Sequence, residues 1–236
     1  IQAFRLEVLQ DCGAYPKWGA YLPEFTRQLA CGVYDIDRVE CEFKSLMTNT
    51  APTCAYRGAG RPEATAAIER AVDLFAAEIG MDPAEVRRIN FIPSHAFPFT
   101  TATGTLYDSG DYEKALDAAL EASDYKGLRA EQEKRRQNKS TKQIGIGVAT
   151  YVEITGFGGS EYGHVSLRPD GTVLATTGAT PIGTGHFTTW AMIVADKLGI
   201  PMEKIELFHG DTDIVPTGET TGGSRSVQLA GSAMAD

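Results

Sequence analysis

The stretch TNTAPTCAYRGAGRPEA, residues 48–64, decides how this chain is organised, because an irregular segment runs directly into a long helical pattern here. It carries Arg57 and Arg61, with Gly58 and Gly60 between them. A plain surface loop needs neither two flanking cations nor glycines that let another group approach the backbone. A loop built around an anionic ligand needs both, because guanidinium groups bind oxyanions as rigid forks. The segment therefore predicts an anion-binding loop.

The residues after this loop predict a helix from Pro62 to Glu78. Its apolar side chains recur at spacings of four, three and four, which is typical of one helical stripe: Ile68, Val72, Phe75 and Ile79. Pro62 suits a first helical turn, and Gly80 suits a C-terminal cap.

Working outward, the pattern predicts strands and helices on both sides of this helix. Alternating residues predict strands at 4–11 and 38–48, with an irregular stretch at 12–25 and a proline-bearing loop at 91–110. The remaining predictions are a short helix from Asp82 to near Asn90, two exposed helices broken near Ser123-Asp124, β-runs at 144–156 and 163–178 with a hairpin turn at Asp170-Gly171, a helix at about 186–198, a strand at 204–211 and a helix opening near Ser226.

This order of elements predicts an α+β fold with two lobes. We expect a first lobe at residues 1–104, a helical connector at 105–142 and a second lobe at 143–236. The chain does not begin with Met, and it ends within a predicted helix. We therefore expect it to be an internal part of a longer protein.

Composition excludes several classes of protein. The 236 residues are 42% hydrophobic and 22% charged, which is ordinary for a globular chain. The net charge of -9 argues against nucleic-acid and anionic-membrane partners, so the basic run 134–136 is interpreted as a solvated face. No apolar run reaches the length of a membrane span, and no secretory signal is identified. The four irregularly spaced cysteines are expected to be reduced thiols of a cytoplasmic protein.

Three glycine-bearing segments stand directly before predicted helices, at residues 55–64, 180–190 and 217–233. A helix start leaves backbone N–H groups unpaired and carries partial positive charge, and glycine lets a ligand come close. Three such starts predict a large phosphorylated cofactor, although simple helix capping explains any one of them. The segment after Gly183 does not complete a GxGxxG pattern, since position 188 is Thr, and no GKS or GKT phosphate loop is present.

Four motifs together resemble one family. TNTAPTCAYRGAGRPEA, GTGHFTTWAMIVADKLGIP, HGDTDIVPTGETTGGSRSVQLAGSA and the earlier GAY are similar to the molybdopterin-binding large subunit of the xanthine dehydrogenase and aldehyde oxidase family, with a likeness to carbon monoxide dehydrogenase large chains. The resemblance implies a molybdopterin cofactor, in its cytosine dinucleotide form. It also implies oxidation of a small-molecule aldehyde or N-heteroaromatic substrate, with electrons leaving through iron–sulfur and FAD partners in a hetero-oligomer.

The resemblance assigns roles position by position. Arg57 stands for the arginine beside the molybdenum, where a guanidinium stabilises a developing oxyanion. Gly58 stands where the carbon monoxide enzymes carry a copper-binding cysteine, so carbon monoxide oxidation is disfavoured. Thr184 stands where a glutamine is usual. The remaining residues expected at the cofactor are Ala59, Gly183, Gly185, His186, Gly222, Gly223, Ser224, Arg225 and Ser226.

Other expected features are not identified in this chain. The family's general base is a glutamate of a Gly-Glu motif near the C-terminal end of the subunit, and a Gly-Gly-x-Phe-Gly loop also contacts the cofactor. We identify neither motif in this chain, so the isolated chain is expected to be inactive. Glu153 is interpreted as a core or rim carboxylate, and no protein ligands for a metal are expected.

Two further interpretations were weighed. A cofactor-free structural or interaction module of the same fold is the alternative, and Thr184 favours it. A generic dinucleotide-binding dehydrogenase is excluded, because no strand–GxGxxG–helix unit with a later acidic residue is present.

Overall fold

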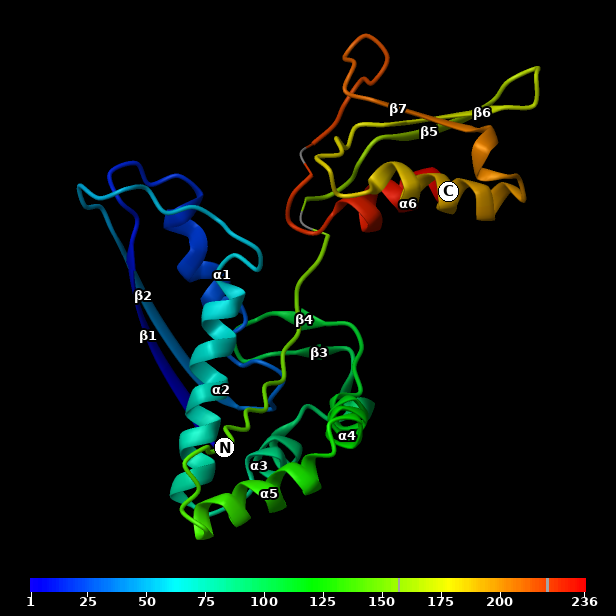
Figure 1. Cartoon of the computed structure of the whole chain (residues 1–236). Coiled ribbons are helices and arrows are strands. Elements are labelled where there is room, and N and C mark those ends of the chain that lie inside the picture. Colours follow the sequence, from blue (N-terminus) through cyan, green and yellow to red (C-terminus); the bar gives the residue numbers. More distant parts are fainter. Residues whose placement is uncertain (157, 220) are drawn as a thin grey trace. The chain divides into compact units, whose positions relative to one another are not determined.

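The protein consists of two compact units, residues 1–153 and 154–236, in a computed structural model (Figure 1). The structure describes residues 1–156, 158–219 and 221–236. Helices combine with two small sheets in the first unit and with one in the second, which confirms the predicted α+β class. Within these described ranges, no helix is long and apolar enough to cross a membrane.

The first unit contains most of the helices. Its elements are β1 (Ala3–Asp11), η1 (Trp18–Tyr21), α1 (Leu22–Gln28), β2 (Arg38–Leu46), α2 (Arg61–Glu78), α3 (Pro83–Asn90), η2 (Ser94–Ala96), β3 (Phe99–Thr100), β4 (Leu106–Tyr107), α4 (Tyr112–Ala122) and α5 (Tyr125–Gln137).

Strands β1 and β2 lie side by side and run parallel, with α1 in the crossover between them (Figure 1). The prediction that residues 12–25 are irregular is wrong where η1 and α1 begin. Pro23 lies in the first turn of α1, where a missing N–H costs no helical hydrogen bond. The proline therefore starts a helix instead of interrupting one. The loop predicted at 91–110 likewise contains the short antiparallel pair β3–β4.

Helix α2 forms at its predicted place but buries a different stripe. Ile68 and Val72 are buried as expected, whereas Phe75 and Ile79 are exposed. The buried row follows a spacing of four and continues through Ala64 and Ala76. These alanines are small enough to let neighbouring segments pack closely, and a search for large apolar side chains overlooks them.

Helices α3, α4 and α5 complete the first unit. The break between α4 and α5 falls where predicted, at Ser123-Asp124. Leu116 of α4 and Tyr125 of α5 belong to the same buried core as Ile68 and Val72. The segment expected to connect two lobes therefore packs within the first unit. The lobe boundaries at 104 and 142 stay predictions about cofactor-binding domains.

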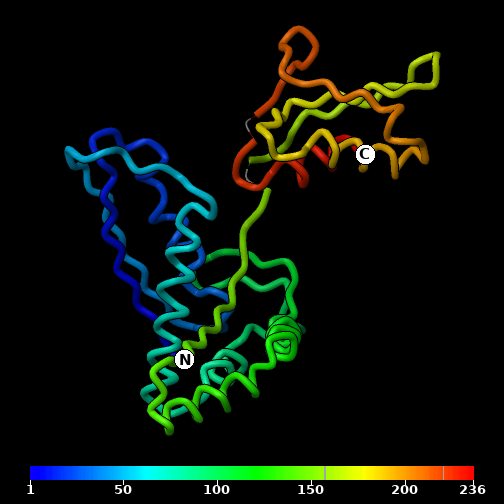
Figure 2. Tube along the Cα trace, in the orientation of Figure 1, coloured from blue at the N-terminus to red at the C-terminus, as the bar shows by residue number. Residues whose placement is uncertain are grey.

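An extended segment, residues 143–153, follows α5 and runs alongside α2 (Figure 2). Its side chains alternate between exposed and partly buried, as predicted for a β-run. It forms no β-ladder with any described residue, so the predicted strand at 144–156 is wrong. Alternating burial of side chains shows that one face of an extended segment is packed. A β-strand also requires hydrogen bonds to a neighbouring strand.

The second unit is a three-stranded sheet with helices on one face. Strands β5 and β6 form the predicted hairpin, and β7 pairs parallel with β6. Trp190 and Val194 of α6 pack on Val173 and Ala175 of β6, and Met234 joins them. The elements are β5 (Gly163–Leu167), β6 (Val173–Thr177), α6 (His186–Leu198), η3 (Met202–Lys204), β7 (Ile205–His209), a π-helical turn η4 (Ser226–Gly231) and α7 (Ser232–Ala235).

Candidate functional site

The Arg57 turn, residues 56–60, connects an irregular segment to α2. The N–H of Ala59 donates to the carbonyl of Tyr56 at 2.8 Å, and that of Arg61 donates to Gly58 at 3.2 Å. Gly58, Ala59 and Gly60 have φ values of 93°, 44° and 86°. Three successive left-handed residues, one of them alanine, make a strained turn of the kind found at functional sites.

Arg57 is the exposed cation of this turn. Its side chain points into solvent, and no described residue forms a hydrogen bond or ion pair with its guanidinium. A guanidinium with unused donors can bind an anionic oxygen through two parallel N–H groups. The turn therefore presents Arg57 as an exposed cation, and its role as a binding group stays a prediction.

Arg61 does not have the ligand-facing role that its sequence position predicts. Its side chain is buried, and its Nε and Nη2 donate to Glu153 at 3.1 and 2.6 Å. The start of α2 also offers few free donors, because Arg61 N–H is already bonded and Pro62 has none. The interpretation of the α2 start as an open anion site is wrong, and Glu153 is the rim carboxylate that was expected.

In the second unit, three loops meet at one edge of the sheet. Thr177, the last residue of β6, is opposite both His209, which ends β7, and Gly163, which begins β5. The loops before β5, after β6 and after β7 therefore leave the sheet at this edge. Ligands of sheets with parallel strands commonly bind beyond the carboxyl ends of those strands.

Direct contacts join these three loops. The N–H of Gly178 donates to the carbonyl of Tyr162 at 3.1 Å, and that of Gly156 donates to Ser224 at 3.2 Å. A Cβ atom on Gly178 would lie 2.5 Å from the Cα of Gly218, so the two backbones touch. The predicted segments 180–190 and 217–233 are therefore brought together within the second unit.

The loop before α6 is exposed backbone. Gly183 and Gly185 have φ values of 88° and 79°, and no heavy atom lies within 4 Å of the Cβ position of either residue. Thr184 Oγ1 lies 3.0 Å from Nδ1 of His186, whose ring stacks on Trp190 at 5.0 Å. Thr184 thus orients His186, and the N–H groups of Gly183 and Gly185 form no hydrogen bond with the described residues.

The loop before η4 divides into an exposed part and a buried part. Gly222, Gly223 and Ser224 are exposed, whereas Arg225 and Ser226 are buried. The carbonyl of Ser226 accepts a hydrogen bond from the indole N–H of Trp190 at 3.0 Å. This bond holds the start of η4 against α6.

Arg225 lies inside the junction of the loops. Its guanidinium donates to Glu219 and to the carbonyl of Ser160, the latter at 2.7 Å, and lies 3.6 Å from Glu161. Its buried Nε has no hydrogen-bond partner among the described residues. Arg225 therefore joins the loops, and its Nε–H group remains without a hydrogen-bond partner among the described residues.

Two parts of this edge were not predicted from the sequence. Gly159 is open backbone, whereas a Cβ atom on Gly156 would lie 2.8 Å from Gln228 and one on Gly158 would lie 3.1 Å from Glu219. Three glycines in four residues were the available signal. Glu161 accepts from the N–H groups of Tyr162 and Glu219 and approaches Arg225, a role that no sequence pattern announces.

A Gly-Glu pair occurs at Gly218-Glu219, which corrects the prediction that the chain has none. Its carboxylate accepts a hydrogen bond from Arg225, so it is part of the loop junction. Thr220, in the same motif, lies outside the described residues.

The edge carries groups of the kinds that bind a flat, phosphorylated heterocycle. Exposed glycine backbone at 183 and 185 supplies N–H groups, and Ser224 supplies a hydroxyl. The buried Nε of Arg225 and Nδ1 of His209 lack partners among the described residues, and His209 ends β7 at this same edge. Across the described ranges, no cluster of His, Cys, Asp or Glu could hold a metal ion by itself.

The fold and this edge have the features of a cofactor-binding chain. Two family models, both described as a molybdopterin cofactor-binding domain, match residues 1–91 and 118–236. The second match covers half of the chain, so the chain belongs to the family of molybdopterin cofactor-binding domains. Because the site residues themselves are not tested by these matches, their individual roles stay predictions.

Particular relatives agree with this class. The carbon monoxide dehydrogenase large chain of Hydrogenophaga pseudoflava is 40% identical over 251 residues, which cover 100% of this chain and 31% of the relative. Among solved structures, the carbon monoxide dehydrogenase of Oligotropha carboxidovorans has a TM-score of 0.90 at 35% identity, covering 99% of this chain and 32% of that one. Quinoline 2-oxidoreductase of Pseudomonas putida 86 has a TM-score of 0.86 at 30% identity, covering 95% and 30%. The chain thus spans about a third of the length of these relatives.

Proposed function

We propose that this chain is the cofactor-binding part of a molybdenum hydroxylase that oxidises an aldehyde or an N-heteroaromatic compound. The observation that carries the proposal is the Arg57 turn, where an unpaired guanidinium is followed by Gly58, which supplies no thiolate. A soft metal such as copper requires a thiolate in this position, so carbon monoxide is not the substrate. The likeness to a quinoline oxidoreductase supports an N-heteroaromatic substrate.

The glycine edge of the second unit binds the cofactor in this proposal. The backbone N–H groups at Gly183, Gly185 and Gly223 donate to phosphate and pterin oxygens, and Ser224 adds its hydroxyl. We infer the cytosine dinucleotide form, whose second phosphate would use the remaining donor of Arg225. His186 borders the cofactor, held in place by Thr184 and Trp190.

Arg57 acts on the substrate. When bound, the molybdenum cofactor supplies the centre that accepts two electrons, and the oxygen comes from water. The Arg57 guanidinium would donate N–H groups to the atom that gains negative charge when the carbon is attacked. That atom is the carbonyl oxygen of an aldehyde or the ring nitrogen of an N-heteroaromatic compound, and the contact lowers the barrier electrostatically. Electrons then leave through iron–sulfur and FAD partners, and the general base is supplied by another part of the parent subunit.

Substitution of Arg57 in the cofactor-loaded parent enzyme tests this role. We expect Arg57→Ala to lower kcat about 100-fold or more, as removal of an oxyanion donor does elsewhere. The molybdenum content, measured by mass spectrometry, should stay near that of the unmodified enzyme. Arg70→Ala, which removes an exposed arginine from α2, is the matched control and should leave kcat unchanged.

A panel of quinoline, an aromatic aldehyde and carbon monoxide identifies the substrate class. Turnover of carbon monoxide, or an unchanged kcat in Arg57→Ala, would contradict the proposal. Release of cytidine monophosphate on acid hydrolysis tests the dinucleotide form. A parent protein that purifies without molybdenum would instead support a cofactor-free interaction module.

A further inference from the structure

The ion pair between Arg61 and Glu153 is a buried tie beside the Arg57 turn. Arg61 is the first residue of α2 and directly follows the three left-handed residues. Its side chain is 6% exposed, and its guanidinium lies 5.4 Å from the centre of the Phe25 ring. Glu153 accepts hydrogen bonds from Nε and Nη2 of Arg61. Removing one partner of such a pair leaves a charge poorly solvated, so the pair resists separation.

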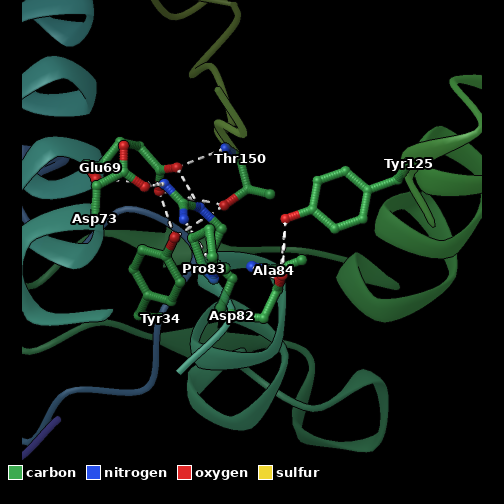
Figure 3. Close-up of polar contacts among 9 residues, drawn as sticks. Tyr34, Glu69, Asp73, Asp82, Pro83, Ala84, Tyr125 and Thr150 are labelled. Carbon is green, nitrogen blue, oxygen red and sulfur yellow. Dashed lines mark hydrogen bonds and ion pairs between the residues drawn. The ribbon is translucent and has the colours of Figure 1, made fainter. Parts of the chain in front are cut away.

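The segment that carries Glu153 is laid along α2. Thr150 donates from its backbone N–H to Glu69 at 2.9 Å, within the polar network of Tyr34, Glu69 and Asp73 (Figure 3). Eight helical residues from Glu69 back to Arg61 span about 12 Å. Three extended residues from Thr150 to Glu153 span about 10 Å. The two lengths match, so this segment runs antiparallel to α2 and ends at the helix start.

The Arg57 turn has side-chain anchors only at its C-terminal end, among the described contacts. Thr26 Oγ1 donates to the carbonyl of Gly60 at 2.8 Å, and Arg61 is held by Glu153. The side chains of Arg57 and Ala59 form no described polar contact. Strained backbone persists only where its surroundings hold it, so the anchors at 60 and 61 maintain the turn.

We propose that Glu153 is a positioning residue for Arg57, acting through Arg61 to hold the strained turn in its presenting conformation. The effect of this ion pair on activity rests on the proposed role of Arg57. Its effect on the conformation of the turn does not depend on that role. Glu153 also stands at the last position of the first unit. Its bond to Arg61 therefore fixes the point where the chain leaves that unit, beside the turn.

Tryptic cleavage after Arg57 in the full chain measures the turn directly. We expect Glu153→Gln to speed cleavage at Arg57 at least fivefold, because a released turn fits a protease more readily. Cleavage after Lys139, an exposed site remote in sequence, should keep its rate. Hydrogen exchange at residues 56–60 should rise in parallel.

Asp73→Asn is the matched control. Like Glu153, Asp73 has a side chain that is 35% exposed and forms an ion pair with a buried arginine, here Arg87 at 2.9 Å. This ion pair lies away from the Arg57 turn. The Asp73→Asn variant should leave cleavage at Arg57 within twofold of the unmodified rate. Equal acceleration in both variants, or no acceleration in Glu153→Gln, would overturn the proposal. If Glu153→Gln does not fold, Arg61→Lys keeps the charge, removes the fork and is judged by the same outcomes.

Kinetics of the loaded parent enzyme provide a second readout. Glu153→Gln should lower kcat at least tenfold while KM and molybdenum content stay within twofold. A loss of molybdenum with unchanged kcat per molybdenum would overturn the positioning role. If Arg57→Ala has no effect on kcat while proteolysis still responds to Glu153→Gln, the tie stands and the proposed function fails.

Discussion

Arg87 has a fully buried guanidinium that organises the polar network of the first unit. It donates to Glu69 at 2.8 Å and lies 2.9 Å from Asp73, and Tyr34 donates its hydroxyl to the same Glu69 (Figure 3). Burial, followed by the charge of Glu69, raises the pKa of Tyr34 far above its usual value. The phenol therefore remains a neutral donor, and the network keeps one arginine between two carboxylates.

Tyr125 makes a testable contribution at high pH. Its hydroxyl lies 3.0 Å from both oxygens of Asp82, and burial, with this bond, raises its pKa to about 12 (Figure 3). Because the folded pKa exceeds the unfolded value of 10.0, the contribution is complete below pH 10 and is lost as pH rises towards 12. Urea unfolding between pH 8 and 12 should show this loss.

Tyr125→Phe is the control for this effect. It should lower the free energy of unfolding at pH 8 by about 1 kcal/mol, because one hydrogen bond is removed. It should also flatten the decline above pH 10. An equally steep decline in the phenylalanine variant would contradict the assignment to Tyr125.

At the scale of elements, the start of α2 depends on Gly60. A Cβ atom there would lie 2.2 Å from the carbonyl oxygen of Leu22, and φ is 86°. Gly60→Ala should therefore destabilise the chain by about 3 kcal/mol, from backbone clash and left-handed strain together. Urea unfolding measures the difference.

Gly80→Ala provides the matched comparison at the other end of α2. Gly80 also has a positive φ, 66°, but nothing lies within 4 Å of its Cβ position. Only conformational strain applies, so the cost should be about 1 kcal/mol. Equal costs at Gly60 and Gly80 would show that α1 does not pack closely on the start of α2.

The elements that the sequence predicts well are those whose signals are local. Asp82 caps α3 by accepting from Ala84 N–H at 2.8 Å, and Gly199 ends α6 in the left-handed conformation, as their residue types indicate. The failures at α1 and at 143–153 have another cause. Whether Pro23 starts a helix, or whether an alternating run finds a partner strand, depends on tertiary neighbours that periodicity does not contain.

The candidate site was predictable to a similar degree. Glycine-bearing loops at 183–185 and 222–224 were found from composition, and Arg57 from its resemblance. The burial of Arg61 and Arg225 was not predicted, because the residue type alone does not distinguish an exposed arginine from a buried one that joins loops. Glu161 was missed because its partners come from three different loops. The cofactor contacts of all these residues stay predictions.

At the scale of the whole molecule, each unit has its own apolar core. Val86 is 1% exposed in the core of the first unit, and Val194 is 1% exposed in that of the second. Because the cores share no residue, we expect two separable unfolding transitions. Val86→Ala and Val194→Ala should each cost about 2 kcal/mol and each lower one transition by several degrees.

Differential scanning calorimetry distinguishes these transitions. The variant in one core should leave the melting temperature of the other transition unchanged within a degree or two. A single transition that moves by the same amount in both variants would show that the units unfold together.

The contact between Gly178 and Gly218 has a consequence for protein engineering. Since the two backbones touch, the connections after β6 and β7 are mechanically joined, and neither can change length alone. A library that seeks new selectivity should randomise 180–182 and 211–214 while both glycines remain fixed. Variants with any larger residue at either glycine are expected not to fold, and so to be lost before selection for activity begins.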